Sequence, residues 1–403
     1  MPVGVREAAM QAVRQTRRAL AYTCVVLFGA ACAPRLPVLP AAPYPNPPVV
    51  LDHIIYTTGE GIWRTDMTAS YADFLAGGRS AAVSPDGRLV AYLELQRPAE
   101  RLKASPALKV VDVEGTLPRT LVPAGTGDYG QDLPSFVWSS DSREIAYVLL
   151  RASQPGRLDR VEINTVDLAT GATQTVHSER LPNTAVVPEL LGWSSQRQEI
   201  YLVQDASARM YVINVQRQSV SSFPLPSPDM SSPLTLRLTL ALSPGFEQVA
   251  VVTMPSAREV SNQIVAVDMR SRTRSSIVGE AQPCRTYLHP AWSPDGRYLA
   301  YYAQYGCRRL GSLSSGSDAG EEFQGVWIAD LQTGRSWRVA DDRVLGITWH
   351  SSGRLVGFWR RGGRAGADLT FHTLRTDGSD RRDILLARDE RAPSALRFVG
   401  WSR

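Results

Sequence analysis

The sequence is poor in the residues that most catalytic and metal-binding sites use. Its 403 residues include only five histidines and four cysteines. Neither HExxH nor GxSxG occurs, and no cysteine pair has the spacing of zinc ligands, so the commonest metalloprotease and serine-hydrolase signatures are absent. Packed or solvated roles are expected for four of the histidines: His53, His177, His350 and His372. We therefore expect neither a metal nor a cofactor.

Lysine is also scarce. Lys103 and Lys109 are the only two, and the formal net charge of +5 rests on arginine. Residues 1–31 hold four of the arginines against one glutamate, which leaves about +2 on the rest of the chain. A chain so close to neutral is not expected to bind nucleic acid. We interpret the arginine excess as genome composition, with arginine-specific recognition as the alternative.

The N-terminal region has the features of an export signal. Residues 1–18 are polar and net basic, and residues 19–33 are apolar except for Thr23. A run of roughly 15 residues is too short for an ordinary transmembrane helix and suits the core of a signal peptide. We therefore expect residues 1–31 to be a signal peptide. The sequence leaves open whether export uses the Sec or the twin-arginine route.

The residues after this signal indicate a tether. The small residues Gly29 to Ala31 precede Cys32 and resemble the lipobox of bacterial lipoproteins, which implies lipidation of Cys32. Ordinary secretion with cleavage before this cysteine, or an uncleaved anchor, are the alternatives. Residues 32–50 are rich in proline and favour extended polyproline II. This segment would hold a domain of residues 51–403 away from a membrane.

A short phrase recurs seven times along that domain. Its clearest copy runs from Trp292 to Tyr301 and reads WSPDGRYLAY. We number each copy by its Ser, or by the His that replaces the Ser in one copy. The seven positions are Ser84, Ser139, Ser194, Ser243, Ser293, His350 and Ser402. The intervals are roughly 55, 55, 49, 50, 57 and 52 residues, a period typical of propellers and repeat arrays.

Each copy contains the residues of a tight hairpin. In the copy at Ser84, the residues Ser, Pro and Gly occupy the first, second and fourth positions of a type I turn, which favours them. The run after the turn is apolar on both faces, as in residues 144–148, and is expected of a strand buried between two sheets. A third strand follows in most repeats, as in residues 161–168, and then a fourth, as in residues 336–339. Each repeat is therefore predicted to be one four-stranded antiparallel blade.

The seventh copy contains a single strand, and its three missing strands are predicted at the start of the domain. Residues 53–57, 61–66 and 71–75 supply them. Pairing residues 395–401 with these strands would close the ring without an open sheet edge. The predicted fold class is all-β, a seven-bladed β-propeller closed by its C-terminal strand, with six blades as the alternative.

The phrase resembles the WD40-like repeats called PD40, which occur in the propeller of the translocation protein TolB and in prolyl oligopeptidase-type enzymes. The resemblance covers about residues 51–403 and implies the fold. The additional N-terminal domain of TolB-like proteins and the hydrolase domain of the peptidases are not expected here. A shared fold does not assign a function.

Two cysteines remain in the predicted propeller, Cys284 and Cys307, at equal distances in sequence from the turn of residues 294–297. That spacing places them opposite each other at the mouth of the hairpin, and in an exported protein it predicts a disulfide. A bridge there would pin the loop of residues 303–323 and stabilise the domain by about 3 kcal/mol. Two unpaired buried thiols are the alternative.

A propeller site is expected to use the innermost strands and the loops at one mouth of the channel. The last positions of those strands carry no carboxylate pair, which counts against glycoside hydrolysis. Polar candidates lie one or two positions farther from the turn: Arg79, Glu189, His289 and Arg397. Several loops on that side are basic, Arg308 and Arg309 among them, and such a rim can attract an anionic partner. Interleaved acidic residues favour a mixed, solvated rim instead.

The expected function is that of a non-catalytic, envelope-tethered propeller, a monomer that binds a protein, peptide or glycan through its loop-bearing mouth. The protein would be exported and either anchored by a lipid or secreted. One alternative is a hydrolase or lyase that uses the mouth residues near Glu189 and His289. Another is a TolB-like envelope assembly factor.

Overall fold

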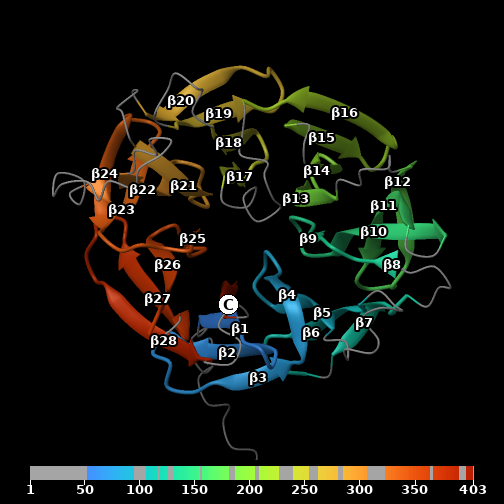
Figure 1. The fold of residues 1–403 in the computed structure, drawn as a ribbon, viewed down its shortest axis with the longest axis horizontal. Coiled ribbons are helices and arrows are strands. Elements are labelled where there is room, and N and C mark those ends of the chain that lie inside the picture. The colour runs from blue at the N-terminus through green and yellow to red at the C-terminus, as the bar shows by residue number, and fades with distance from the viewer. Residues whose placement is uncertain are drawn as a thin grey trace, which may run out of the picture. The chain divides into compact units, whose positions relative to one another are not determined.

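Seven antiparallel sheets form a ring in the computed structural model (Figure 1). The structure describes residues 52–94, 106–116, 118–125, 131–154, 157–180, 187–204, 208–226, 239–253, 262–279, 285–305, 323–363, 366–389 and 396–402. In these ranges the secondary structure is almost entirely β, and none of their helices has the length and apolar character needed to cross a bilayer. The prediction of an all-β, seven-bladed propeller is confirmed.

Several predictions concern residues outside the described ranges. These are the signal peptide, the proline-rich segment, lipidation of Cys32 and the disulfide between Cys284 and Cys307. Arg308 and Arg309 also lie outside them. All of these stay predictions.

The first three blades follow one another along the chain, each named from its innermost strand outward. Blade 1 contains β4 (Gly78–Val83), β5 (Leu89–Glu94), β6 (Leu108–Asp112) and β7 (Arg119–Val122). Blade 2 contains β8 (Gln131–Asp132) and β9 (Phe136–Trp138), which both pair with β10 (Glu144–Gln154), and then β11 (Arg157–Asp167) and β12 (Thr173–Arg180). Blade 3 contains β13 (Pro188–Ser194), β14 (Glu199–Gln204), β15 (Arg209–Asn214) and β16 (Ser219–Pro224).

The next three blades repeat this arrangement. Blade 4 contains β17 (Leu240–Leu242), β18 (Gln248–Val252), β19 (Ile264–Asp268) and β20 (Arg274–Val278). Blade 5 contains β21 (Arg285–Trp292), β22 (Tyr298–Tyr305), β23 (Gly325–Asp330) and β24 (Arg335–Ala340). Blade 6 contains β25 (Gly346–Trp349), β26 (Leu355–Gly362), β27 (Asp368–Arg375) and β28 (Arg382–Arg388).

Blade 7 is assembled from both ends of the propeller. Its innermost strand is β29 (Arg397–Ser402), which pairs with β1 (His53–Thr57), and β2 (Ile62–Asp66) and β3 (Asp73–Ala76) follow outward. In the register of β1 and β29, His53 lies opposite Ser402 and Thr57 opposite Arg397. The predicted closure of the ring is therefore confirmed, and β1 has the predicted limits.

The hydrophobic core lies between the blades. Among the described residues, seven clusters of buried side chains each combine residues of two neighbouring blades. All five residues of β1 are buried. Ile54 and Tyr56 join the cluster between blades 6 and 7, whereas Ile55 joins the cluster between blades 7 and 1. The second strand of a blade therefore contacts both neighbouring blades and must be apolar on both faces, as the sequence pattern indicated.

The recurring phrase forms the same turn in blade after blade. In blade 1, Gly87 N donates to Ser84 O at 2.8 Å and has a φ of 76°, which glycine adopts without strain. Ser84 Oγ donates to the Asp86 carboxylate at 2.6 Å and accepts from Leu89 N at 3.0 Å. The Ser and Asp of the phrase therefore fix the turn itself.

His350 takes the place of the Ser in blade 6. Its Nδ1 lies 2.8 Å from Ser352 Oγ and accepts from the backbone N of Ser352 at 3.2 Å, so the ring acts as the hydroxyl does elsewhere. Its Nε2 lies 3.0 Å from the Asp52 carboxylate, immediately before β1. This histidine therefore joins the turn of blade 6 to the start of blade 7.

The tryptophan of the phrase ties neighbouring blades together. The indole N–H of Trp138 donates to Ala82 O at 3.0 Å, that of Trp292 to Ala241 O at 3.0 Å and that of Trp349 to Ala291 O at 2.9 Å. Each acceptor lies in the innermost strand of the preceding blade. The indole nitrogens of Trp193 and Trp401 are buried without a hydrogen-bond partner in the described part of the chain.

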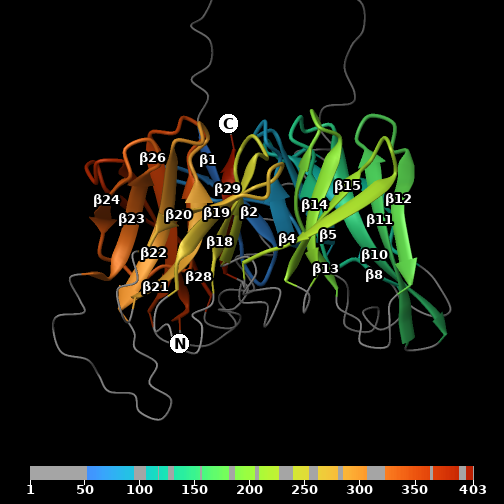
Figure 2. The same ribbon diagram turned by 90° about the horizontal axis from the view of Figure 1, so that it is seen from above.

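The ring has two different faces. We call the face with the short first-to-second and third-to-fourth strand connections the turn face. The opposite face carries the second-to-third strand connections and the connections between blades, and we call it the loop face. Figure 2 shows the ring from its side, with the long hairpin of β10 and β11 projecting at the loop face. The innermost strands run from the loop face to the turn face.

Candidate binding site on the loop face

The four polar candidates of the innermost strands lie toward the loop face. They are Arg79 in β4, Glu189 in β13, His289 in β21 and Arg397 in β29. Arg79 and Arg397 are exposed, whereas Glu189 and His289 are 7% and 9% exposed. Only β4 and β29 are neighbours in the ring, because β17 separates β13 from β21. The structure thus brings the two arginines onto adjacent blades and leaves the other two residues apart.

A third arginine lies close to Arg397. Arg361, near the loop-face end of β26, donates to Leu396 O at 3.0 Å. Burial lowers the pKa of Arg361, and the positive charge of Arg397 lowers it further. Blades 6, 7 and 1 therefore each contribute an arginine at this face. An anionic group placed between them would relieve the repulsion between like charges.

His289 is not suited to carry charge. Its burial lowers the pKa of the imidazole to about 4, so the ring is neutral at neutral pH. The ring centroid lies 6.5 Å from that of Tyr302, and within the described ranges the imidazole makes no hydrogen bond. General acid–base catalysis by histidine normally needs a partner that orients the ring. The surroundings of His289 resemble those of a packing residue.

Two innermost strands take a left-handed backbone conformation at the same place. His289 has a φ of 55° and Ser80 a φ of 51°, and each lies four residues before the Ser of its phrase. The register of β21 and β22 shifts between Leu288 and Ala291, and β4 and β5 shift in the same way beside Ser80. Such bulges redirect side chains at the rims of β structures. The register also shifts in β13 and β29, so the left-handed residue is what distinguishes β4 and β21.

Two arginines of the basic rim are ion-paired. Arg151 Nε lies 2.7 Å from the Glu162 carboxylate, and Arg360 lies 3.3 Å from Asp342. These pairs agree with a mixed rim rather than a uniformly positive one. In the part of the chain that the structure covers, no three His, Cys, Asp or Glu residues are placed to hold a metal ion.

A cleft of about 630 Å³ opens at the loop face between blades 6 and 7. We call it the seam cleft, and its lining comprises Tyr56, Thr58, Gly59, Glu60, Trp63, Ala72, Leu386, Ala387, Arg388 and Asp389. Gly59 N donates to the Asp389 carboxylate at 3.2 Å across the seam, and Trp63 Nε1 donates to Thr58 Oγ1 at 3.1 Å. These bonds hold the aromatic wall of the cleft in place.

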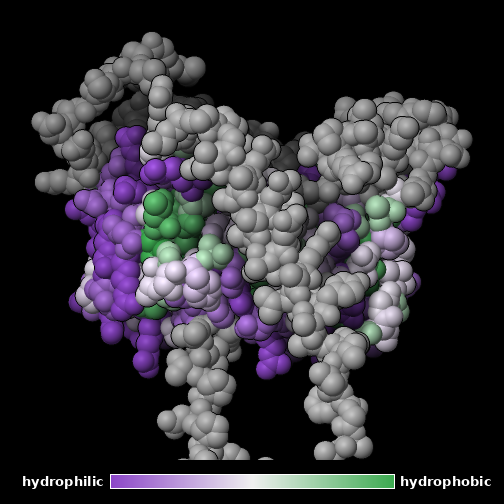
Figure 3. Space-filling model, turned by 90° about the horizontal axis from the view of Figure 1, so that it is seen from below, coloured by the Kyte–Doolittle hydropathy of each residue, from purple (hydrophilic) through white to green (hydrophobic). Residues whose placement is uncertain are grey.

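Hydrophobic side chains continue from the seam cleft onto the outside of the ring. Figure 3 views the side where β28 and β3 are the outer strands and shows a hydrophobic patch bordered by hydrophilic residues. Leu385 of β28 and Phe74 of β3 are both 51% exposed. The rings of Phe74 and Trp63 meet edge to face with centroids 5.2 Å apart. Aromatic surface of this kind is typical of binding interfaces.

Patterns in the sequence indicate only part of this cleft. The pairing of Tyr56 with Trp63 follows from the short connection between β1 and β2. Leu386 and Asp389 are more than 300 positions away, and only ring closure brings them to Tyr56. No pattern within a single repeat indicates that contact.

No family model matches the chain, and a search of curated proteins finds no match either. Solved structures do resemble it. The β-propeller domain of the trilobed protease from Pyrococcus furiosus is 14% identical, with a TM-score of 0.53 over 83% of this chain and 94% of that one. That propeller is described as having an open velcro topology, whereas β29 and β1 close the ring here.

Two further structures are similar at lower scores. TolB from Acinetobacter baumannii is 18% identical, with a TM-score of 0.45 over 87% of this chain and 82% of that one. The periplasmic gluconolactonase of Pseudomonas aeruginosa is 13% identical, with a TM-score of 0.49 over 87% and 99%. At these identities the likeness extends to the fold alone, a β-propeller.

Proposed function

We propose that this protein is a non-catalytic β-propeller of the cell envelope that binds a protein, peptide or glycan partner with its loop face. The observation that carries the proposal is the seam cleft, an aromatic-walled cavity of about 630 Å³ at that face. Its volume lies in the range of sites that enclose part of a ligand. Arg388, Asp389 and Glu60 at its edge supply the polar rim that interfaces need.

The arginines at the mouth of the channel support an acidic partner surface. Arg79, Arg361 and Arg397 come from three successive blades and approach the same mouth. Arg361 is partly desolvated there, so its charge acts through a less polar medium than water. An acidic segment of a protein, peptide or glycan that enters the mouth from the seam cleft would meet this charge.

A catalytic role is less well supported. The neutral, hydrogen-bond-poor His289 lies on a different blade from Glu189, and blade 4 separates the two. A hydrolase or lyase would need an acid and a base on one substrate. The envelope location rests on the N-terminal sequence pattern, a basic stretch followed by a short apolar run and a small-residue cleavage site.

Position-specific crosslinking in intact cells tests the proposal. A photoreactive amino acid replaces Glu60, an exposed residue at the rim of the seam cleft, and in a second strain it replaces the exposed Thr333 of the turn face. Irradiation should give a discrete adduct from position 60 and none from position 333. Mass spectrometry and glycan staining then identify the adduct as protein, peptide or glycan.

Two outcomes would contradict this assignment. The loop face is not the binding face if both positions give the same adducts. If only the protein itself is recovered after crosslinking from position 60, a stable partner at this face is excluded. A small substrate then becomes the better hypothesis.

A further inference from the structure

A second cavity lies on the opposite face, between blades 3 and 4. Its volume is about 460 Å³, and its walls come from the turn-face ends of β14, β15 and β19 with the turns beside them. Four arginines dominate the lining: Arg197, Arg217, Arg270 and Arg272. We call this cavity the arginine pocket. It shares no residue with the seam cleft.

The charge of the arginine pocket is not balanced by its own residues. Glu199 is the one acidic residue in its lining, so the arginines exceed the carboxylates by three. The hydroxyl of Tyr201 already donates to the Glu199 carboxylate at 2.6 Å. Within the described ranges, no ion pair holds Arg217, Arg270 or Arg272. All three of these side chains are exposed.

Arg272 is fixed in position before any ligand arrives. Its guanidinium carbon lies 3.7 Å from the centre of the Phe223 ring, a cation–π contact that crosses from blade 4 to blade 3. Burial lowers the pKa of Arg272, while Glu199 and Asp268 partly offset that effect. The side chain therefore holds a partly desolvated charge at a set place. Ordering such a side chain in advance reduces the entropy cost of binding.

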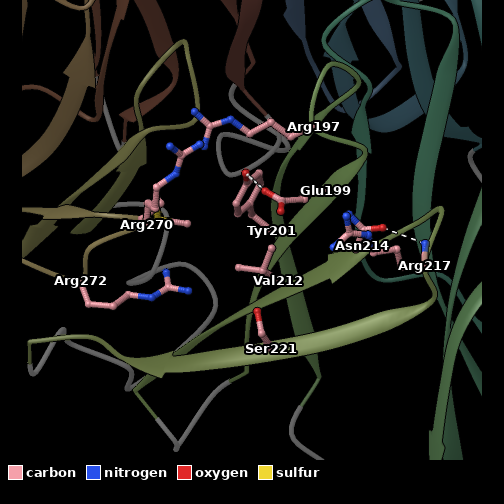
Figure 4. A pocket seen from close by; sticks show the side chains of 10 residues that line it. Arg197, Glu199, Tyr201, Val212, Asn214, Arg217, Ser221, Arg270 and Arg272 are labelled. Carbon is pink, nitrogen blue, oxygen red and sulfur yellow. Dashed lines mark hydrogen bonds between the residues drawn. The ribbon is translucent and has the colours of Figure 1, made fainter.

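Arg197 and Arg270 complete the upper wall of the cavity. Figure 4 shows their side chains pointing toward one another from blades 3 and 4, with the Glu199–Tyr201 pair below them. Arg197 is held by Phe246 O at 3.0 Å and by the Glu247 carboxylate at 3.4 Å. Arg270 has no comparable partner among the described residues. Two guanidinium groups that approach each other in this way favour a bridging anion.

We propose that the arginine pocket binds a phosphate group, with the unpaired Arg270 and Arg272 among its donors. Arginine suits this role because its planar fork donates two parallel hydrogen bonds to phosphate oxygens. The remaining volume, walled by Val212 and Met269, accommodates the group that carries the phosphate.

A free phosphate ester and a phospholipid headgroup are both possible sources of that group. The described chain enters the propeller at the turn face, because β1 starts there at His53. The arginine pocket opens on that same face. The experiment separates the two sources.

Binding to the purified protein is measured with inorganic phosphate and glycerol 3-phosphate by calorimetry. Sedimentation with phosphatidylglycerol vesicles, and with phosphatidylcholine vesicles as the uncharged reference, forms the second arm. We expect saturable binding in at least one arm. The double variant Arg270→Gln/Arg272→Gln should weaken it at least tenfold. Arg335→Gln, which removes an exposed turn-face arginine of blade 5, should leave it unchanged.

A gain of affinity provides a test that misfolding cannot imitate. Glu199→Gln removes the one carboxylate of the lining and keeps an oxygen for the Tyr201 hydroxyl, so phosphate binding should tighten severalfold. Binding of phosphate esters alone assigns a soluble ligand, and binding of phosphatidylglycerol vesicles alone assigns a headgroup. The proposal is wrong if neither probe binds saturably, or if the double variant and Arg335→Gln bind alike.

Discussion

The two ends of an innermost strand in this propeller follow different rules. At the turn-face end of β21, Trp292 and Ser293 make the same hydrogen bonds as Trp138 and Ser139 of blade 2. At its loop-face half, His289 takes a left-handed conformation that only β4 shares among the described innermost strands. Equivalent positions elsewhere hold serine, leucine, threonine, glycine or phenylalanine.

This difference has a physical cause. The turn-face ends must fit the preceding blade, so they have similar neighbours and similar residues recur there. The loop-face ends meet connections of unequal length and composition, so nothing forces them to agree. Repetition therefore marks the residues that hold the ring together, and candidate binding residues lie where the repeats differ.

The largest expected effect comes from removing a complete innermost strand. Deleting residues 394–403 removes β29 and leaves β1 without its inner partner. It also removes the aromatic contacts that Phe398 and Trp401 make with Phe371. We expect loss of the cooperative unfolding transition, measured by calorimetry. Deleting Arg403 alone, which follows β29, is the control. A truncated protein that melts with unchanged cooperativity would contradict closure by β29.

The next effect tests the loop-face half of β21. His289 has a pKa of about 4 in the folded protein and an ordinary value of 6.5 when unfolded. The unfolded state therefore binds more protons below pH 6.5, and the folded protein loses stability as the pH falls from there toward 4. Between pH 7 and pH 5 the free energy of unfolding should drop by about 2 kcal/mol more in the wild type than in His289→Asn.

Asparagine is chosen there because it tolerates the positive φ of this position. Urea unfolding of both proteins at pH 7 and pH 5 provides the measurement. If the free energy of unfolding depends on pH in the same way in both proteins, the pKa of His289 is not lowered in the folded state and the prediction is wrong.

A smaller effect is expected at the turn-face end of the same strand. Trp292→Phe removes the N–H that donates to Ala241 O and leaves that carbonyl without its partner. Trp193→Phe removes an indole nitrogen that has no partner among the described residues. The first change should cost about 1 kcal/mol more than the second, the usual net value of one hydrogen bond. Equal losses in urea unfolding would mean that the interblade bond contributes nothing.

The smallest effect concerns the turn itself. Gly296 has a φ of 71° and open space where a Cβ would lie. Gly296→Ala should therefore destabilise the protein by about 1 kcal/mol, from backbone strain alone. Gly77→Ala is the matched control, because that glycine also has open space around it and no positive φ. If both variants are destabilised equally, the positive φ of Gly296 does not cause the loss of stability.

Much of the fold follows from short-range patterns. The limits of β1 were predicted to the residue, because a buried apolar run bounded by turn residues leaves little choice. β2 and β3 differ from their predicted limits by one or two residues at their ends. The blade count and the closing strand follow from counting a phrase whose turn has a fixed length.

The candidate sites could be predicted less completely from the sequence. Arg79, Glu189, His289 and Arg397 lie on the innermost strands as predicted, but the buried state of Glu189 and His289 did not follow from their polarity. The copy at Ser194 looks like a decayed turn, with Arg197 in place of the usual glycine. In the structure that arginine reaches Phe246 O of the next blade. A residue that departs from its repeat thus gained a contact that the repeat could not predict.

By itself, the sequence determined the architecture: the period, the turn residues, the doubly buried second strands and the strand that closes the ring. These features depend on interactions within a blade or on contacts that recur between neighbouring blades. The same residues therefore recur in most copies of the phrase. The tertiary structure alone decided the seam cleft and the arginine pocket. Tyr56 meets Leu386, and Arg272 meets Phe223, only because blades pack side by side, and no local pattern encodes which side chains face each other across a seam.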